Sequence, residues 1–232
     1  MVKWYRGDIR YPCTVNEKGD KVQNTRARPV YNDVGYIRKL LGEATRLREA
    51  SNLGAKFLQR TFGNFDKRLN PHAFEQCHAY ACREDLFDAD GKDRNSLILS
   101  GGVGTGKTHL AAAIANHLVS KGIPVLFGTF GEHLEKIKEE FDVTDRREYL
   151  SKMKSTPMLV LDDVGKENST DWSKQILFDV INYRYEHKYP FVITTNLNDR
   201  DLRKHIGEAL YSRACEICGM VITGDKDQRR NQ

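Results

Sequence analysis

Gly101-Gly102-Val103-Gly104-Thr105-Gly106-Lys107-Thr108 is the stretch of sequence that decides the fold. It matches the phosphate-loop pattern GxxxxGK[ST], follows an apolar run at 96–100 and opens a helical pattern of apolar residues. The glycines let the backbone curl so that N–H groups point at phosphate oxygens, and the helix N-terminus adds partial positive charge. We expect Lys107 to bridge the β- and γ-phosphates of a nucleotide and Thr108 to bind Mg²⁺, with His109 completing the binding set.

Two apolar runs end in polar residues that suit the same site. The run that begins at Met158 ends in Asp162 and Asp163, and the run at 191–195 is followed by Asn196. We expect Asp162 to hold Mg²⁺ directly or through water and Asp163 to orient or activate the attacking water. Because the carboxyl ends of parallel strands line a ligand crevice, Asn196 is expected to bind the γ-phosphate or that water. A simple strand cap is the alternative for Asn196.

The order of elements predicts an α/β fold with a central parallel sheet flanked by helices. Expected helices cover 71–87, with Asn70 as cap and Pro71 first, then 108–120, 131–141, 145–153 and 172–187. Expected strands cover 96–100, 124–129, 158–161 and 191–195. Strands that alternate with helices in this way form βαβ units.

The N-terminal segment differs from the remainder in charge. Residues 1–55 hold eleven Lys or Arg against six Asp or Glu, so they carry the whole net charge of +5. Residues 1–34 read as short strands or loops, and apolar spacing from 36 to 58 predicts a helix that ends near 52–54, with Gly54 able to cap it. We place a domain boundary near residue 55. This segment either contacts nucleic acid or an acidic partner, or is a solvated leader.

Composition excludes several protein classes. No apolar run approaches the ~18 residues of a membrane helix, and the first residues lack a secretory signal, so we expect a cytoplasmic protein without a membrane partner.

The five cysteines are odd in number and suggest no disulfide framework. Zinc is an alternative for the cysteine and histidine pairs, but the pairs lie over 130 residues apart, which favours reduced thiols. These pairs are Cys77 and Cys82, near His72 and His78, and Cys215 with Cys218.

The motifs, taken in order along the chain, resemble those of a known family. The order GGVGTGKTHLAAAIANHL, MLVLDDVG, FVITTNLNDRDL and GEALYSR is similar to the DnaC/DnaI bacterial helicase loaders and the related IstB transposition ATPases, over roughly residues 56–224. The resemblance implies an AAA+ P-loop ATPase core at 56–232 that uses ATP and Mg²⁺. It also implies that Arg60 and Phe62 lie near the adenine, and that Arg213 is an arginine finger that reaches the γ-phosphate of a neighbouring subunit.

The sequence departs from the family pattern at two places. Many such proteins have Glu at the second acidic position, where this chain has Asp163, and the shorter side chain is expected to make hydrolysis slow. A second sensing arginine is also implied, for which Arg229 or Arg230 is available, but no further helices follow them. We therefore expect little or no lid domain.

A helical element between the second and third strands is the candidate DNA contact. In initiator and loader ATPases an extra helical element occupies this place, and Lys136, Lys138, Arg146 and Arg147 would follow a single-stranded phosphate backbone. The same stretch carries interleaved Asp and Glu, so a solvated helix face remains the alternative.

Three functions stay open on the sequence. The favoured hypothesis is ATP-dependent loading of a hexameric replicative helicase onto single-stranded DNA, by subunits that assemble in a nucleotide-dependent oligomer, with residues 1–55 gripping the helicase. The second is a transposition helper ATPase that acts on duplex DNA. The third is an adaptor that binds nucleotide without hydrolysing it.

Overall fold

The computed structural model describes residues 2–6, 9–15, 21–23, 30–31, 45–47, 49–68, 70–87, 94–139 and 143–224. Contacts divide the chain into two compact units, Met1–Arg46 and Leu47–Gln232. The division falls upstream of the boundary expected near residue 55, because Ser51 and Leu53 are buried in the second unit. The backbone carbonyl of Ser51 also accepts a 2.8 Å hydrogen bond from the N–H of Phe127.

The first unit contains an antiparallel sheet. Its strands are β1 (Val2–Arg6), β2 (Ile9–Val15), β3 (Lys21–Gln23) and β4 (Val30–Tyr31), and β2 pairs with each of the other three. The expectation of short strands in this region is confirmed. The first part of the expected helix, residues 36–44, lies outside the described residues.

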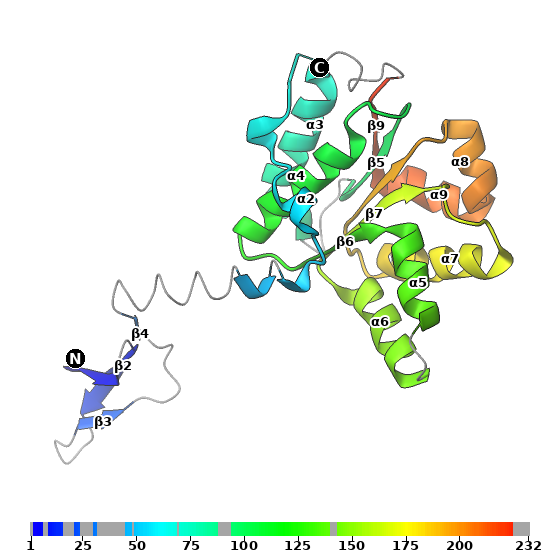
Figure 1. Cartoon of the computed structure of the whole chain (residues 1–232). Coiled ribbons are helices and arrows are strands. Elements are labelled where there is room, and N and C mark those ends of the chain that lie inside the picture. Colours follow the sequence, from blue (N-terminus) through cyan, green and yellow to red (C-terminus); the bar gives the residue numbers. More distant parts are fainter. Residues whose placement is uncertain are drawn as a thin grey trace. The chain divides into compact units, whose positions relative to one another are not determined.

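A parallel sheet of five strands forms the centre of the second unit (Figure 1). The strands are β5 (Ser96–Ser100), β6 (Val125–Thr129), β7 (Met158–Val164), β8 (Phe191–Thr195) and β9 (Cys218–Ile222), in the order β6-β7-β8-β5-β9. This order puts β8 between β5, which precedes the phosphate loop, and β7, which carries the acidic residues. The carboxyl ends of all three strands meet at one edge of the sheet.

Helices cover both faces of the sheet. They are α2 (Ala55–Leu58), α3 (Pro71–Cys82), α4 (Lys107–Ser120), α5 (Phe130–Glu139), α6 (Val143–Ser155), α7 (Asp171–Glu186), α8 (Asp199–Ile206) and α9 (Glu208–Ile217). Short 3-10 turns lie at Phe62–Asn64 and Asp85–Phe87. This is the α/β fold, with a central parallel sheet flanked by helices, that the sequence predicts.

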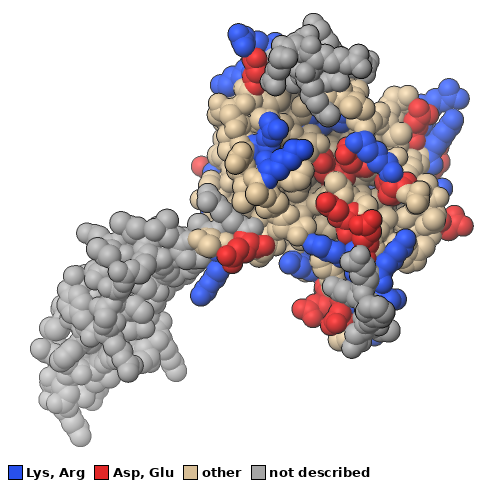
Figure 2. Space-filling model, viewed as in Figure 1, with Lys and Arg blue, Asp and Glu red and all other residues tan. Residues whose placement is uncertain are grey.

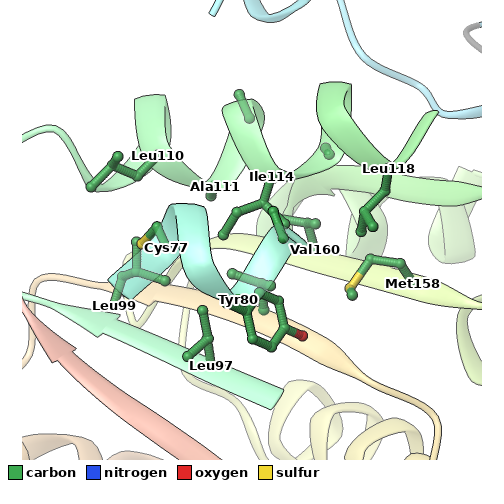
Figure 3. Packing of buried hydrophobic residues seen from close by; sticks show 14 of the residues in the cluster. Cys77, Tyr80, Leu97, Leu99, Leu110, Ala111, Ile114, Leu118, Met158 and Val160 are labelled. Carbon is green, nitrogen blue, oxygen red and sulfur yellow. The ribbon is translucent and has the colours of Figure 1, made fainter. Parts of the chain in front are cut away.

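Alternate strand residues build two separate cores. Leu97 and Leu99 pack with Met158 and Val160 against α3 and α4, as Figure 3 shows, whereas Ile98 belongs to a second cluster with residues of α5 to α9. Side chains of a strand alternate between faces, so a continuous apolar run is buried on both sides. The first cluster seats α4, and with it the phosphate loop, on the sheet.

Several element boundaries differ from expectation. Helix α3 begins as expected, with the Asn70 side chain accepting from the Ala73 N–H at 3.1 Å, but it ends at Cys82 and not near 87, because Arg83 adopts an extended conformation. The helical turn at 49–50 ends at Asn52, whose φ of 59° is left-handed, so Asn52 takes the role expected of Gly54. Helices α8 and α9 and strand β9 are additions to the expected set.

Candidate functional site

A cleft of about 510 Å³ lies at the carboxyl end of the sheet. Its lining includes these candidate site residues from the sequence: Arg60, the phosphate loop from Val103 to His109, Asp162, Asp163 and Asn196. The remaining lining residues are Lys56, Phe57, Asn64, Phe65, Asp66, Thr129 and Lys166. Its volume lies within the usual range for small-molecule and cofactor sites.

The phosphate loop holds Lys107 in the lining of the cleft. Its Nζ donates to the carbonyl oxygens of Gly101 at 2.8 Å and Gly102 at 2.6 Å, and its side chain is buried. Gly106 caps α4 with a φ of 93°, a left-handed conformation that favours glycine. The amino group and the N-terminus of α4 thus offer positive charge and N–H donors to a bound phosphate group.

The loop is fastened to the end of β9. The N–H of Gly102 donates to the carbonyl of Gly224 at 2.8 Å, and the hydroxyls of Thr105 and Thr223 lie 2.6 Å apart. A Cβ at Gly101 would lie 2.3 Å from Oγ1 of Thr223 and 2.6 Å from the Gly224 carbonyl oxygen, so the backbones approach too closely for any side chain. Strand β9, which the sequence did not predict, therefore fixes the shape of the loop.

Asp162 is buried and held by two hydroxyls. Its Oδ1 accepts from Oγ1 of Thr108 at 2.9 Å and from Oγ1 of Thr194 at 2.5 Å. Burial raises the pKa of the Asp162 carboxyl above its usual value, and the two hydroxyl bonds oppose that rise. The negative charge of Asp163 nearby raises it further.

The Thr108 and Asp162 oxygens fit a magnesium ion. Mg²⁺ prefers oxygen ligands in octahedral geometry at about 2.0–2.1 Å, so two adjacent ligands lie about 2.9 Å apart. That spacing equals the 2.9 Å between Oγ1 of Thr108 and Oδ1 of Asp162. Both atoms face the cleft beside Lys107, where the ion would neutralise charge on the β- and γ-phosphates.

Asp163 has an unusual backbone for a strand residue. Its φ is 57°, the pairing of β7 with β8 shifts register between Leu161 and Val164, and its N–H donates to Oγ1 of Thr194 at 2.9 Å. Left-handed conformations at residues other than glycine are uncommon and concentrate at functional sites. The bulge turns the Asp163 side chain into the cleft, where its Oδ2 lies 2.6 Å from Nζ of Lys166.

Side-chain bonds also fix the loop that carries Asn196. Oγ of Ser100 donates to the carbonyl of Leu197 at 2.7 Å, and Oγ1 of Thr195 donates to the carbonyl of Val164 at 2.7 Å. The three strand ends are thereby tied together. Asn196 is half-buried and lines the cleft near Asp163.

Aromatic and basic residues also line the cleft. Phe57, Arg60 and Phe65 line it, as does His109, whose Nε2 lies 3.0 Å from the Thr61 carbonyl oxygen. Burial lowers the pKa of His109, which favours the neutral ring.

Phe62, assigned to the adenine from sequence, does not line the cleft. Its ring packs edge-on against Phe74, with ring centroids 5.7 Å apart, and against His78 at 5.1 Å. The 3-10 turn at Phe62–Asn64 places this ring beside α3, while Phe57 and Phe65 line the cleft. The place of Phe62 near the adenine stays a prediction.

Arg213 lies on α9, away from the cleft of its own chain. Its guanidinium carbon is 5.6 Å from the ring centroid of Phe178 and 5.8 Å from that of Tyr185. Aromatic faces attract a guanidinium group and restrict its rotamers. The Arg213 side chain is half-buried and does not line the cleft that contains the phosphate loop of its own chain.

The four expected DNA contacts lie on α5 and α6, in different surroundings. Nζ of Lys136 donates to Oδ1 of Asn52 at 2.8 Å, and Nζ of Lys138 lies 4.9 Å from the ring centroid of Trp172. Arg146 and Arg147 are exposed on α6. Figure 2 shows basic and acidic side chains interleaved over the described surface that it presents.

The cysteines and the helices were also considered as a zinc site and as membrane spans. Cys77 and Cys218 are buried and Cys82 and Cys215 exposed, all as free thiols. Among the described residues no group of three or more Cys, His, Asp or Glu side chains is arranged to hold a metal ion. In the same part of the chain no helix is long and apolar enough to cross a membrane. Arg229 and Arg230 lie outside the described residues.

Several site residues escaped the sequence reasoning, among them Thr194, Lys166 and Thr223. Thr194 lies near the carboxyl end of β8, two positions before Asn196, and this position was an available signal. Lys166 and Thr223 have no such local signal, because the bulge in β7 and the pairing of β9 with β5 place them.

Comparison with known proteins gives the family. The model of the "IstB-like ATP binding protein" family matches residues 45–222. The phage-like element PBSX protein XkdC of Bacillus subtilis is 33% identical over 192 residues, which cover 77% of this chain and 70% of XkdC. The replicative helicase loader DnaC of Escherichia coli is 33% identical over 120 residues, 51% of this chain and 49% of DnaC. The chain thus spans about half the length of DnaC.

Solved structures agree on the fold. The crystal structure of the DnaC helicase loader aligns with a TM-score of 0.61 at 24% identity, over 73% of this chain and 99% of that one. DnaI aligns with a TM-score of 0.62 at 22% identity, over 74% of this chain and 94% of that one. The strand order, the cleft and these alignments describe an AAA+ P-loop ATPase fold, and the chain belongs to the IstB-like ATP-binding protein family.

Proposed function

We propose that this protein is an ATP-dependent loader of a replicative DNA helicase onto single-stranded DNA. The observation that carries the proposal is the match to the helicase loaders DnaC and DnaI, at 33% and 31% identity over 120 residues each. Family membership and the cleft support the ATP-binding part. The helicase and the DNA strand are inferred from these two relatives.

The proposed chemistry uses the residues of the cleft. Lys107 and the loop N–H groups bind the phosphates, and Thr108 and Asp162 hold Mg²⁺. Asp163 and Asn196 orient the water that attacks the γ-phosphate. The ATPase activity is slow and rises on assembly, when Arg213 of one subunit reaches the cleft of the next.

The first unit of the chain is the proposed helicase-binding element. Its support is the excess of basic residues in 1–55 and its separation from the ATPase unit after Arg46. Removal of residues 1–46 should abolish helicase binding and leave nucleotide binding unchanged. Unchanged helicase binding would refute this assignment.

Helices α5 and α6 are the proposed contact to single-stranded DNA. Arg146 and Arg147 are exposed there and would pair with phosphates. Changing both to Ala should lower the slope of log affinity against log salt by about 1.4, since each phosphate contact contributes about 0.7 on a single strand. The control is Lys174→Ala on α7, which should leave the slope unchanged. An unaltered slope in the double variant would assign α6 to a solvated face.

The experiment that tests the whole proposal is size-exclusion chromatography with the replicative helicase of the same host. The protein should co-elute with the helicase in the presence of a nucleotide that mimics the γ-phosphate. Separate elution under every nucleotide condition would contradict the loader function.

A transposition helper is the second candidate, and the match to the IstB-like family model favours it. Such a protein should prefer bent duplex over single-stranded DNA and bind a transposase.

A third candidate is an adaptor that binds nucleotide without hydrolysing it, and the contact between Asp163 and Lys166 favours it. Turnover of ATP that disappears in Lys107→Ala and Asp162→Asn would exclude the adaptor.

A further inference from the structure

Lys166 lines the same cleft as Lys107 of the phosphate loop. Both line the cleft, but they contact different partners. Lys107 donates to carbonyl oxygens of the phosphate loop, whereas Nζ of Lys166 donates to Oδ2 of Asp163 at 2.6 Å. The Lys166 side chain is 52% exposed and the Asp163 side chain 26% exposed.

The turn that carries Lys166 is built to hold this contact. The N–H of Lys166 donates to the carbonyl of Asp163 at 3.2 Å, which closes a tight turn. Gly165, with a φ of 96°, permits it, and a Cβ there would lie 2.6 Å from the side chain of Leu197. The turn therefore places the lysine over the carboxylate.

A buried carboxylate fixes the far end of the same turn. The Glu167 side chain is 4% exposed, its Oε2 accepts from the N–H of Gly165 at 2.7 Å, and its Oε1 lies 2.7 Å from Nε2 of His205 on α8. Helix α8 leads directly into α9, which carries Arg213. The turn is thus tied to the part of the chain proposed to meet a neighbouring subunit.

We propose that Lys166 is a positioning residue that restrains ATP hydrolysis by occupying the Asp163 carboxylate. A carboxylate orients water through the lone pairs of its two oxygens, and the ammonium group takes one of these pairs on Oδ2 and holds the carboxylate turned towards Lys166. The chain therefore hydrolyses ATP slowly until the turn shifts and Asp163 is released. The inference rests on the proposed ATPase activity and adds to it a restraint within the chain.

Lys166→Met keeps the length of the side chain and removes its charge. A general base contributes about 10²–10⁴-fold, so release of even part of that effect should raise kcat of the full-length chain at least about fivefold, without a change in KM. Lys166→Arg, which retains the charge, should keep the rate of the parent. Lys174→Met, an exposed change on α7, is the matched control and should also keep it.

Two outcomes would overturn the restraint. An unchanged kcat in Lys166→Met would show that the contact does not limit hydrolysis, and a lower kcat with a raised KM would make Lys166 a phosphate ligand instead. Co-elution with the helicase, measured on the same samples, separates these results from failure of the loader function. A helicase-binding protein with unchanged kcat refutes only the role of Lys166.

Discussion

The hydroxyl of Thr194 donates a 2.5 Å hydrogen bond to Oδ1 of Asp162 and accepts a 2.9 Å bond from the N–H of Asp163. One side chain on β8 thus orients both acidic residues of β7. Its position follows from the strand order, which makes β8 the neighbour of β7. Because burial still raises the pKa of Asp162, the ionised carboxylate is held at a cost in folding free energy.

Asp162→Asn should therefore stabilise the protein in the absence of nucleotide. A carboxyl whose pKa is higher in the folded than in the unfolded state destabilises the fold at neutral pH, and the penalty disappears as the pH falls through the raised pKa towards 3.8. Removing the charge should add about 1 kcal/mol at pH 7 and less near pH 4, while Mg²⁺-dependent hydrolysis is lost. Thermal unfolding at both pH values measures this.

The control for that prediction is Asp179→Asn on α7, which changes the same charge at a less buried position. It should give no comparable gain in stability. A variant Asp162→Asn that is less stable than the parent at pH 7 would contradict the account of Asp162.

Gly101→Ala tests the attachment of the phosphate loop to β9. The new Cβ would overlap Oγ1 of Thr223 and the Gly224 carbonyl, so either the loop or the strand must move. We expect a loss of about 2 kcal/mol in the free energy of unfolding and much weaker ATP binding. The control is Gly54→Ala, because nothing lies within 4 Å of a Cβ there. Urea denaturation and binding of a fluorescent nucleotide should separate the two variants, and equal behaviour would refute the close approach.

Arg184→Met tests a structural role for a buried arginine. Its guanidinium is fully buried and donates to the carbonyls of Met153 at 3.0 Å, Lys154 at 3.1 Å and Pro157 at 3.1 Å, and also to Pro190. The methionine would leave these carbonyls unsatisfied, at a cost of about 3 kcal/mol in unfolding free energy. Arg200→Met, at an exposed site on α8, should cost less than about 0.5 kcal/mol. Similar costs for both variants would contradict this role.

Sequence reasoning recovered the parts of the molecule that depend on local patterns. The phosphate loop follows from its spacing, and the strands that carry Asp162 and Asn196 follow from continuous apolar runs between turns. Their meeting at one edge follows from parallel topology.

The parts that were missed depend on contacts distant in sequence. Strand β9 has a glycine at its second position and follows a helix directly, so its local pattern does not indicate a strand. Its pairing with β5 stabilises the extended conformation. The bulge at Asp163 depends on its hydrogen bond to Thr194 on the neighbouring strand. In each case tertiary contact, and not local preference, decides the conformation.

The role of Arg213 can be tested by mixing two inactive variants. Arg213→Ala should bind ATP as well as the parent, because Arg213 lies outside the cleft of its own chain, but lose about 10³-fold in assembly-stimulated hydrolysis. Lys107→Ala subunits cannot hydrolyse ATP yet still carry Arg213. A mixture of the two should recover part of the stimulated rate, because one subunit supplies the phosphate loop and the next subunit supplies the arginine.

Steady-state hydrolysis across mixing ratios measures this recovery. The control variant Arg200→Ala alone should keep the rate of the parent. A mixture as inactive as its components would make Arg213 a structural residue of α9, held by Phe178 and Tyr185.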